Sequence, residues 1–166
     1  MSVNIALLTV TDTRTLETDK SGNILVEKIN KAKHNLVERK ICKDNKEDIK
    51  IILKEWTHKK DLDVIITTGG TGLTGRDITP EALDEIADKH IPGFGEIFRY
   101  YSLETVGTSS IQSRACAILS NGKYIFALPG SSGGVTDAWD KILVHQLDIN
   151  HKPCNFVELF PRLKEK

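Results

Sequence analysis

Apolar residues follow two periodicities over the first half of the chain. Val3 to Val10 and Leu62 to Thr67 are largely apolar runs, typical of strands covered on both faces, and Leu36 to Cys42 alternates apolar with charged residues. Asp12 to Gly22 is polar and is predicted to be a loop. Two sets of apolar positions between the apolar runs recur at helical spacing: Ile24, Leu25, Ile29 and Ala32, then Ile49, Ile52, Leu53 and Trp56. Strands that alternate with helices over short links predict a parallel sheet with helices on both faces.

The last third of the chain predicts a hairpin and a final helix. Ala115 to Leu119 and Tyr124 to Leu128 are apolar runs on either side of an Asn-Gly pair, which is a strong turn signal. The segment from Val135 to Gln146 has helical spacing, and the tail from His151 is expected to pack irregularly because it contains two prolines.

Composition restricts the class of protein. At 166 residues, with 39% apolar and 28% charged residues, the chain is expected to form one soluble domain spanning residues 1–166. Its 23 basic and 23 acidic residues cancel, which argues against binding to nucleic acid or membrane, and no apolar segment is long enough to span a bilayer. Three well-separated cysteines and five histidines without ligand spacing argue against a zinc site or disulfides and favour the cytoplasm.

The segment from Thr67 to Leu83 carries the strongest chemical signal. Four glycines lie between a predicted buried strand and a predicted helix, whose N-cap would be Thr79 with Pro80 at the first helical position, and which would continue through Ala87. Glycine lets backbone N–H groups approach a ligand, and a helix N-terminus adds partial positive charge, so the loop suits a phosphate. Asp77 in this loop would repel phosphate unless a divalent cation lies between them.

Two familiar phosphate motifs match this loop only in part. Gly70, Gly72 and Gly75 satisfy G-x-G-x-x-G, but the predicted helix does not begin at the third glycine, and the loop follows the third strand instead of the first. The Walker A spacing also fits, but Arg76 and Asp77 replace its lysine and its hydroxyl residue. A nucleotide-dependent oxidoreductase therefore has little support.

Two other loops are expected at the same edge of the sheet. Thr11 to Arg14 follows the first strand and Pro129 to Gly134 precedes the last helix, and ligands bind beyond the carboxyl ends of parallel strands. We expect the three loops to form the walls of one pocket. Asp44 follows the second strand and shares this edge, but it can instead begin the next helix in a capping box with Glu47.

Two further features leave alternatives open. Arg114 can clamp a phosphate or pair with a carboxylate, and sequence does not choose between these roles. The segment Pro92 to Arg99 is interrupted by glycines and partly aromatic, which is more typical of packing or subunit contact than of catalysis.

Four segments together resemble the MoaB/MogA family of molybdenum cofactor biosynthesis. They are TGGTGLTGRDITPEAL from Thr68, PGFGEIFR from Pro92, SRA from Ser113 and LPGS from Leu128, in family order. The stretch Gly107 to Ala115 and the tail of the chain are more similar to the MoaB branch. The resemblance implies a three-layer α/β/α sandwich with a mostly parallel central sheet and a small hairpin.

The resemblance also implies an enzyme that binds molybdopterin and transfers AMP from Mg-ATP to its terminal phosphate, releasing pyrophosphate. It assigns catalysis and Mg²⁺ binding to Asp44 and Asp77. The residues expected to bind molybdopterin or nucleotide come from short segments along the chain: Thr11, Asp12, Thr68, Gly69, Gly70, Thr71, Gly72, Arg76, Thr79, Pro80, Glu81, Ser113, Arg114, Pro129, Gly130, Ser131 and Ser132.

One departure from the family pattern supports an alternative function. The second loop reads PGSSGG, without the proline that commonly follows the serine or asparagine in catalytic relatives. The alternative is a non-catalytic molybdopterin-binding or scaffolding protein that acts beside a MogA-type enzyme. In either case the resemblance implies a homotrimer or homohexamer, with Pro92 to Tyr101 and the tail near Pro153 as candidate contacts, and other proteins of the same pathway as partners.

Overall fold

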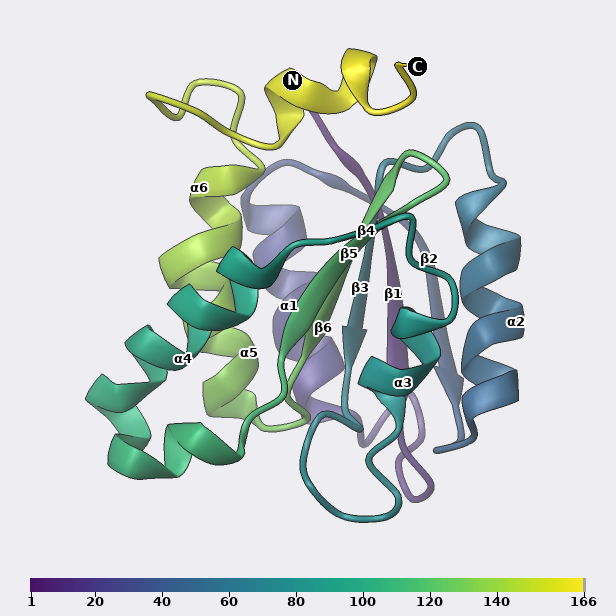
Figure 1. Ribbon diagram of the computed structural model, residues 1–166, viewed down its shortest axis with the longest axis vertical. Coiled ribbons are helices and arrows are strands. Elements are labelled where there is room, and N and C mark those ends of the chain that lie inside the picture. The colour runs from purple at the N-terminus through teal and green to yellow at the C-terminus, as the bar shows by residue number, and fades with distance from the viewer. Residues whose placement is uncertain (166) are drawn as a thin grey trace.

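Six strands form one sheet in the order β2-β1-β3-β6-β5-β4 in the computed structural model, which describes residues 1–165 (Figure 1). The strands have the following bounds: β1 Asn4–Val10, β2 Asn35–Cys42, β3 Val64–Thr68, β4 Lys89–His90, β5 Cys116–Ser120 and β6 Lys123–Leu128. β2, β1, β3 and β6 run parallel, whereas β5 is antiparallel to both β6 and β4. The predicted mostly parallel sheet with a small hairpin is confirmed.

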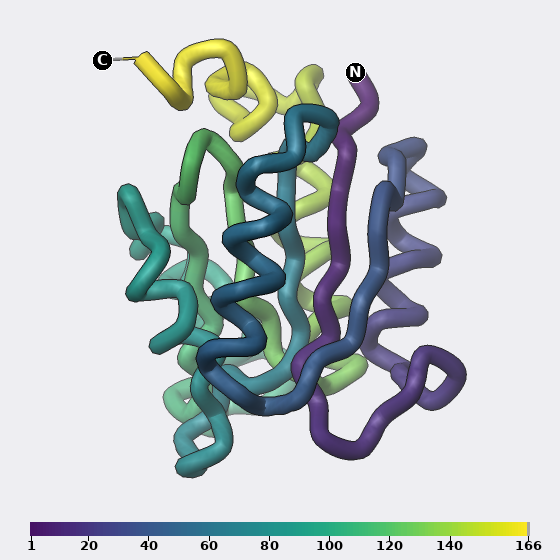
Figure 2. Tube along the Cα trace, turned by 90° about the vertical axis from the view of Figure 1, so that its right-hand side faces the viewer, coloured from purple at the N-terminus to yellow at the C-terminus, as the bar shows by residue number. Residues whose placement is uncertain are grey.

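Helices cover both faces of the sheet and complete a three-layer sandwich, as predicted. One face carries α1 (Lys20–Lys31), α4 (Pro92–Val106) and a last helical stretch made of α5 (Ser132–Ala138), a π-helical turn (Trp139–Leu143) and α6 (Val144–Gln146). The other face carries α2 (Lys46–Thr57) and α3 (Thr79–Asp84) (Figures 1 and 2). Turns of 3-10 helix span Gly107–Gln112 and Val157–Arg162.

The sheet separates two hydrophobic cores. Phe126 and Trp139 lie in the core under α1, α4 and α5, and Trp56 and Ile65 lie in the core under α2 and α3, each at most 2% exposed. Full burial of such side chains stabilises the fold by about 1.5–3 kcal/mol each. Both chain ends lie at the end of the molecule opposite the loops that follow β1 and β3 (Figure 2). Among residues 1–165, no helix is long and apolar enough to cross a membrane.

The turn chemistry of the hairpin explains why it was predictable. Asn121 and Gly122, between β5 and β6, have φ angles of 46° and 71°. Two consecutive positive φ angles are typical of the tight turn that matches the twist of paired strands, and Asn-Gly adopts them at low cost.

Three predicted helix starts are wrong by one or more residues. Asn45, not Asp44, caps α2, because its side chain accepts a hydrogen bond from the N–H of Asp48. Thr79 is not the N-cap of α3 but its first residue, and the helix ends at Asp84, so it does not reach Ala87. Helix α1 begins inside the predicted loop, at Lys20, because the preceding carboxylate caps it.

Helix α4 and strand β4 were not predicted at all. The glycines of α4 hide its periodicity, but one of them has a packing role. A Cβ atom on Gly95 would lie 2.5 Å from the carbonyl oxygen of Ala115, so only glycine lets α4 approach the start of β5 this closely. β4 has only two residues, which is too short for an alternating pattern.

The burial of His34 leads to a prediction of how the stability of the protein depends on pH. His34 is 9% exposed, and its Nδ1 accepts a hydrogen bond from the N–H of Val3 at 3.2 Å, so Nδ1 must be unprotonated. Burial lowers the pKa of His34, the positive N-terminus lowers it further, and Asp148 opposes this. Just below the ordinary histidine pKa of 6.5 the unfolded chain therefore binds more protons than the folded one.

Neutral His34 therefore contributes to the free energy of unfolding. We expect this stabilisation to be complete above about pH 6.5 and to be lost as pH falls through the lowered pKa of folded His34. Urea unfolding between pH 7 and pH 5 measures it. His34→Asn keeps a hydrogen-bond acceptor near Nδ1 and should flatten the decline, whereas His58→Asn, at an exposed position, should leave it unchanged. Equal pH profiles for wild type and His34→Asn would contradict the assignment.

Candidate active site

Three loops leave the same edge of the sheet and meet there. Thr9 pairs with Thr68, and Thr68 pairs with Leu128, so β1, β3 and β6 end side by side. The N–H of Gly69 donates to the carbonyl oxygen of Leu128 at 3.0 Å, and the hydroxyl of Thr68 donates to that of Pro129 at 2.8 Å. The turn after β1, the glycine loop after β3 and the loop after β6 therefore form one continuous surface.

A cavity of about 230 Å³ lies between these loops. Six of the predicted site residues line it: Thr11, Thr68, Gly69, Gly130, Ser131 and Ser132. The start of α1 also lines it, through Asp19, Lys20 and Ser21, which sequence analysis treated as part of a loop. The free N–H groups at this helix end and the charge of Lys20 favour an anionic ligand.

Asp19 is the most buried charged residue of the cavity wall, with 1% exposure. Its carboxylate accepts hydrogen bonds from the Thr9 hydroxyl at 2.6 Å, the Gly22 N–H at 3.0 Å and the Arg39 guanidinium at 3.0 Å. Burial raises the pKa of Asp19, but the hydrogen bonds and the charge of Arg39 outweigh it and the pKa lies below its ordinary value. An aspartate that directly precedes a helix is a capping signal, and it could have located this residue.

The loops meet by close backbone contact that requires glycine. Gly69 has a φ of 102°, and a Cβ atom there would lie 2.2 Å from the carbonyl oxygen of Val10 at the end of β1. A Cβ atom on Gly130 would lie 3.3 Å from the Cα of Gly69. The loops after β3 and β6 are therefore in contact at their first residues.

Asp44 and Asp77 each lie close to a different glycine of the glycine loop. A Cβ atom on Gly70 would lie 3.3 Å from Oδ1 of Asp44, and one on Gly72 would lie 2.8 Å from Oδ2 of Asp77. The N–H and the hydroxyl of Thr74 donate to the same Oδ2 of Asp77, at 2.9 and 2.7 Å. Because Asn45 caps α2, the carboxylate of Asp44 is free of the capping role that sequence analysis left open.

The two carboxylates are close enough to affect each other. Burial raises the pKa of Asp44, and the negative charge of Asp77 raises it further. For Asp77, burial acts in the same direction, but hydrogen bonds from Thr74 and from loop N–H groups outweigh it, and its pKa lies below the ordinary value. Two carboxylates that repel each other in this way suit a divalent cation, which would relieve their repulsion.

The carboxylates of Asp44 and Asp77 fit Mg²⁺ that is also bound by a substrate. Within residues 1–165, no group of three or more histidine, cysteine, aspartate or glutamate side chains is arranged to hold a metal ion. Mg²⁺ is commonly held by one or two carboxylates together with phosphate oxygens of the substrate. Asp44 and Asp77 would therefore hold Mg²⁺ jointly with a bound nucleotide.

The two candidate arginines have different surroundings. Arg76 is exposed on the loop and forms an ion pair with Asp12 of the turn after β1. Arg114 pairs with the carboxylate of Glu81 and donates to the carbonyl oxygens of Gly72 and Asp77, each at 2.7 Å. Of its two predicted roles, Arg114 therefore takes the carboxylate pair.

Several predicted binding residues support the loop from inside the protein. Thr71, Thr79 and Pro80 are buried, and the hydroxyl of Thr79 donates to the carbonyl oxygen of Gly69 at 2.9 Å. None of the three lines the cavity between the loops. These residues pack beneath the glycine loop, and their contact with ligand stays a prediction.

A larger cleft of about 720 Å³ adjoins the loop after β6. Ser113, Pro129, Ser131 and Ser132, all predicted site residues, line one part of it. Much of the rest comes from α4 and the 3-10 turn that follows, which add several hydroxyl groups: Ser102, Thr105, Ser109 and Ser110. The cleft is therefore rich in groups that can hydrogen-bond a polar ring system.

The MoaB/MogA resemblance agrees with comparisons to known proteins. Residues 6–149 match the family model described as "Probable molybdopterin binding domain". The chain belongs to the MoaB/MogA family of molybdopterin-binding domains. The matched range of this family includes all three loops, Asp44 and Asp77, and every other residue predicted to contact ligand.

Comparison with individual family members places the chain in the MoaB branch. Molybdenum cofactor biosynthesis protein B of Escherichia coli K12 is 44% identical over 161 residues, which cover 97% of this chain and 93% of that protein. A crystal structure of molybdenum cofactor biosynthesis protein B superimposes with a TM-score of 0.89 at 40% identity, covering 100% and 98% of the two chains. The tungsten cofactor synthesizing protein MoaB from Pyrococcus furiosus gives 0.76 at 36% identity, covering 86% and 91%.

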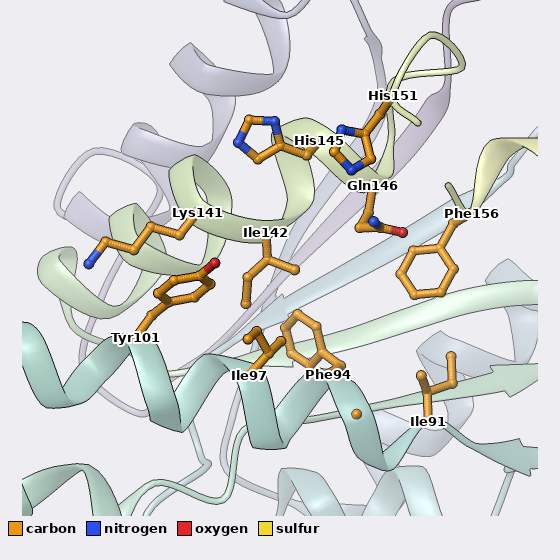
Figure 3. Close-up of a pocket in the computed structure, with 11 residues that line it drawn as sticks. Ile91, Phe94, Ile97, Tyr101, Lys141, Ile142, His145, Gln146, His151 and Phe156 are labelled. Atoms are coloured by element: carbon orange, nitrogen blue, oxygen red, sulfur yellow. The ribbon is translucent and has the colours of Figure 1, made fainter. Parts of the chain in front are cut away.

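A further hollow of about 400 Å³ lies away from these loops, between α4 and the last helical stretch (Figure 3). Phe94, Ile97 and Tyr101 of α4 face Ile142 and Phe156 across it. None of the residues predicted to bind ligand lines this hollow, but it borders the Pro92 to Tyr101 segment that was expected to contact another subunit. Phe98 of the same segment lines the larger cleft beside the loop after β6, so the candidate contact segment adjoins the candidate active site.

Proposed function

We propose that the protein adenylylates molybdopterin. An oxygen of the terminal phosphate of molybdopterin would bond to the α-phosphorus of ATP, and the bond from that phosphorus to pyrophosphate would break. The observation that carries this proposal is that Asp44 and Asp77 both lie close to the glycine loop, whose first residue, Gly69, lines a cavity that favours anions. Membership of the molybdopterin-binding family supports the identity of the acceptor.

The residues of the site would act through position and charge. When bound between Asp44 and Asp77, Mg²⁺ would neutralise charge on the triphosphate oxygens. Backbone N–H groups of the glycine loop, apart from those of Gly69, Gly72 and Thr74, which bond within the protein, would donate to phosphate oxygens. Arg76 on the exposed side of the loop would add a cationic contact. The hydroxyl-rich cleft beside the loop after β6 has a volume in the range typical of small-molecule sites and would hold the pterin.

The direct test is an assay with purified protein, molybdopterin and Mg-ATP. We expect formation of adenylylated molybdopterin together with one equivalent of pyrophosphate, and neither product when Mg²⁺ is removed by chelation. Binding of molybdopterin without any release of pyrophosphate would instead support the non-catalytic alternative.

One observation favours that alternative, a molybdopterin-binding or scaffolding protein. The loop after β6 places Ser132 at the first position of α5, after the cap Ser131, where catalytic relatives commonly have proline. Proline at this position fixes the backbone for helix entry, so its loss leaves the loop less constrained where the nucleotide would bind. Intact Asp44, Arg76 and Asp77 argue for catalysis.

The oxidoreductase hypothesis loses its remaining support. In the dinucleotide fingerprint the third glycine opens the helix, but here α3 begins at Thr79 instead of Gly75. The loop also follows β3, the third strand of the chain. We expect no binding of NAD in a fluorescence titration.

We also propose that the protein forms a homotrimer or homohexamer through α4, with other proteins of the same pathway as further partners. Four apolar side chains of α4 are solvent-exposed in the single chain: Ile97 at 38%, Tyr100 at 62%, Leu103 at 49% and Val106 at 54%. A contiguous exposed apolar surface is typical of a protein contact.

We expect multi-angle light scattering at micromolar concentration to give the mass of three or six chains, and Leu103→Asp to reduce it to one chain. Ile51→Asp, at a position that is 64% exposed on α2, is the matched control and should leave the mass unchanged. A wild-type monomer would contradict the proposal.

A further inference from the structure

One side chain joins both ends of the exposed turn that carries Arg76. The Nε of Arg114 donates to the carbonyl oxygen of Gly72, and its Nη2 donates to that of Asp77, both at 2.7 Å. These two carbonyls bracket the turn from residue 73 to residue 76. A single planar guanidinium therefore fixes the distance across the loop between Gly72 and Asp77.

The remaining donors of Arg114 are directed at Glu81. Nη1 forms an ion pair with Oε1 of Glu81, and Nη2 lies 3.3 Å from Oε2. Glu81 belongs to α3, which packs on the sheet through buried Ala82 and Leu83. The loop is thus tied through Arg114 to an element of the core.

The backbone of Arg114 is held as firmly as its side chain. Its N–H donates to the carbonyl oxygen of Thr71 at 2.9 Å, directly before the bracketed turn. On the other side, Nη1 of Arg99 in α4 donates to the carbonyl oxygens of Ser113 and Ala115, at 3.3 and 3.0 Å. Arg114 is therefore fixed between the sheet, α4 and the loop.

The loop needs such support because its own sequence provides little. Glycine loses more conformational freedom on ordering than any other residue, and this loop has four of them, two with positive φ. The hydrogen bonds that Asp77 makes to this turn are local. Its N–H donates to the Thr74 carbonyl at 3.0 Å, and its side chain accepts from the Thr74 hydroxyl. Local bonds shape the turn, and the exposed ion pair between Arg76 and Asp12 adds only a solvent-screened tie toward Asp44.

We propose that Arg114 is a positioning residue for the adenylyl transfer, which holds the glycine loop so that Asp77 faces Asp44 and the loop N–H groups face the nucleotide. The inference rests on the proposed function. Because its donors are taken up by Gly72, Asp77 and Glu81, Arg114 acts through the loop and does not contact the phosphates.

The test compares Arg114→Lys with Glu81→Gln and with Arg162→Lys. Lysine keeps the charge but cannot reproduce the fork that joins two carbonyls and a carboxylate, and Glu81→Gln weakens the same anchor from α3. Arg162 pairs with Glu165 on the exposed tail and is the matched control. Thermal melting verifies that each variant folds, amide hydrogen exchange reports on residues 71–77 of the free protein, and steady-state kinetics gives kcat and KM.

For Arg114→Lys we expect amide exchange in residues 71–77 to accelerate at least about tenfold, with exchange in β3 unchanged. We expect kcat to fall about 10–100-fold, as for other residues that orient a metal ligand, with KM for molybdopterin within about twofold. Glu81→Gln should also accelerate exchange in residues 71–77 and lower kcat, but by less. Arg162→Lys should change neither the exchange nor kcat.

Unchanged exchange in the Arg114→Lys loop would overturn the proposal, even if kcat falls, because Arg114 would then act on the substrate directly. Faster exchange with unchanged kcat would also overturn it, since loop order would not matter for the reaction. An inactive wild-type protein would overturn the proposed function separately, and the exchange experiment would still decide whether Arg114 holds the loop.

Discussion

Asp77→Asn is expected to lower the rate of adenylyl transfer by about a thousandfold while the protein keeps its fold. Asparagine retains an oxygen that can accept the hydrogen bonds from the N–H and hydroxyl of Thr74, so the geometry of the turn is conserved. What is lost is the negative charge that would share Mg²⁺ with Asp44. Removing a single group that stabilises transition-state charge costs about 10²–10³ in kcat.

The assay is adenylylated molybdopterin formed per unit time at saturating Mg-ATP, with circular dichroism and melting temperature to verify the fold. Asp84→Asn is the matched control, because Asp84 ends α3, is exposed and pairs with His90 outside the loop. It should retain full activity. An Asp77→Asn protein that turns over at the wild-type rate would remove Asp77 from the metal site and with it the main support for the mechanism.

Gly69→Ala is expected to destabilise the protein by about 3 kcal/mol or more and to abolish ligand binding. The φ of 102° is strained for alanine, which alone costs about 1–3 kcal/mol. The new Cβ would also lie 2.2 Å from the carbonyl oxygen of Val10, which is backbone at the end of a central strand and cannot move aside cheaply. Relief of this clash would separate the loops after β1 and β3.

Gly75→Ala, in the same loop, is the control for this prediction. A Cβ atom there meets no atom within 4 Å, and its φ is not in the left-handed region. We expect its free energy of unfolding to stay within about 0.5 kcal/mol of wild type in urea titrations, because it lacks both sources of strain. Equal losses for the two variants would show that loop flexibility, and not the contact with Val10, is what Gly69 provides.

Five strands of the sheet and several of its flanking helices could be predicted because each has a local signal. The apolar run of β1, the Asn121-Gly122 turn and the spacing of the α2 core residues are each explained by residues close in sequence. Helix α4 had no such signal, because glycines interrupt its periodicity and one of them, Gly95, serves a contact with Ala115, a residue distant in sequence. A local pattern cannot reveal a constraint that a distant segment imposes.

The same limit applies to the site. The edge of the sheet that carries the loops was predictable from the order of strands and the position of glycines. Asp44 resembled a helix cap in sequence, and only the geometry of Asn45 shows otherwise. Arg114 had two chemically reasonable partners, and the choice depends on the position of Glu81 in α3. Both cases depend on where neighbouring segments lie in space, which composition and spacing do not determine.

The pairing of β3 with β6 has a consequence for how the protein is made. Gly69 and Thr68 are held by Leu128 and Pro129, which are synthesised much later. During translation the glycine loop therefore emerges long before the strand that completes it, and until then its glycines have no fixed partner on that side. We infer that a nascent chain lacking β6 cannot bind its ligand, so the cell gains a competent site only when nearly the whole domain has folded.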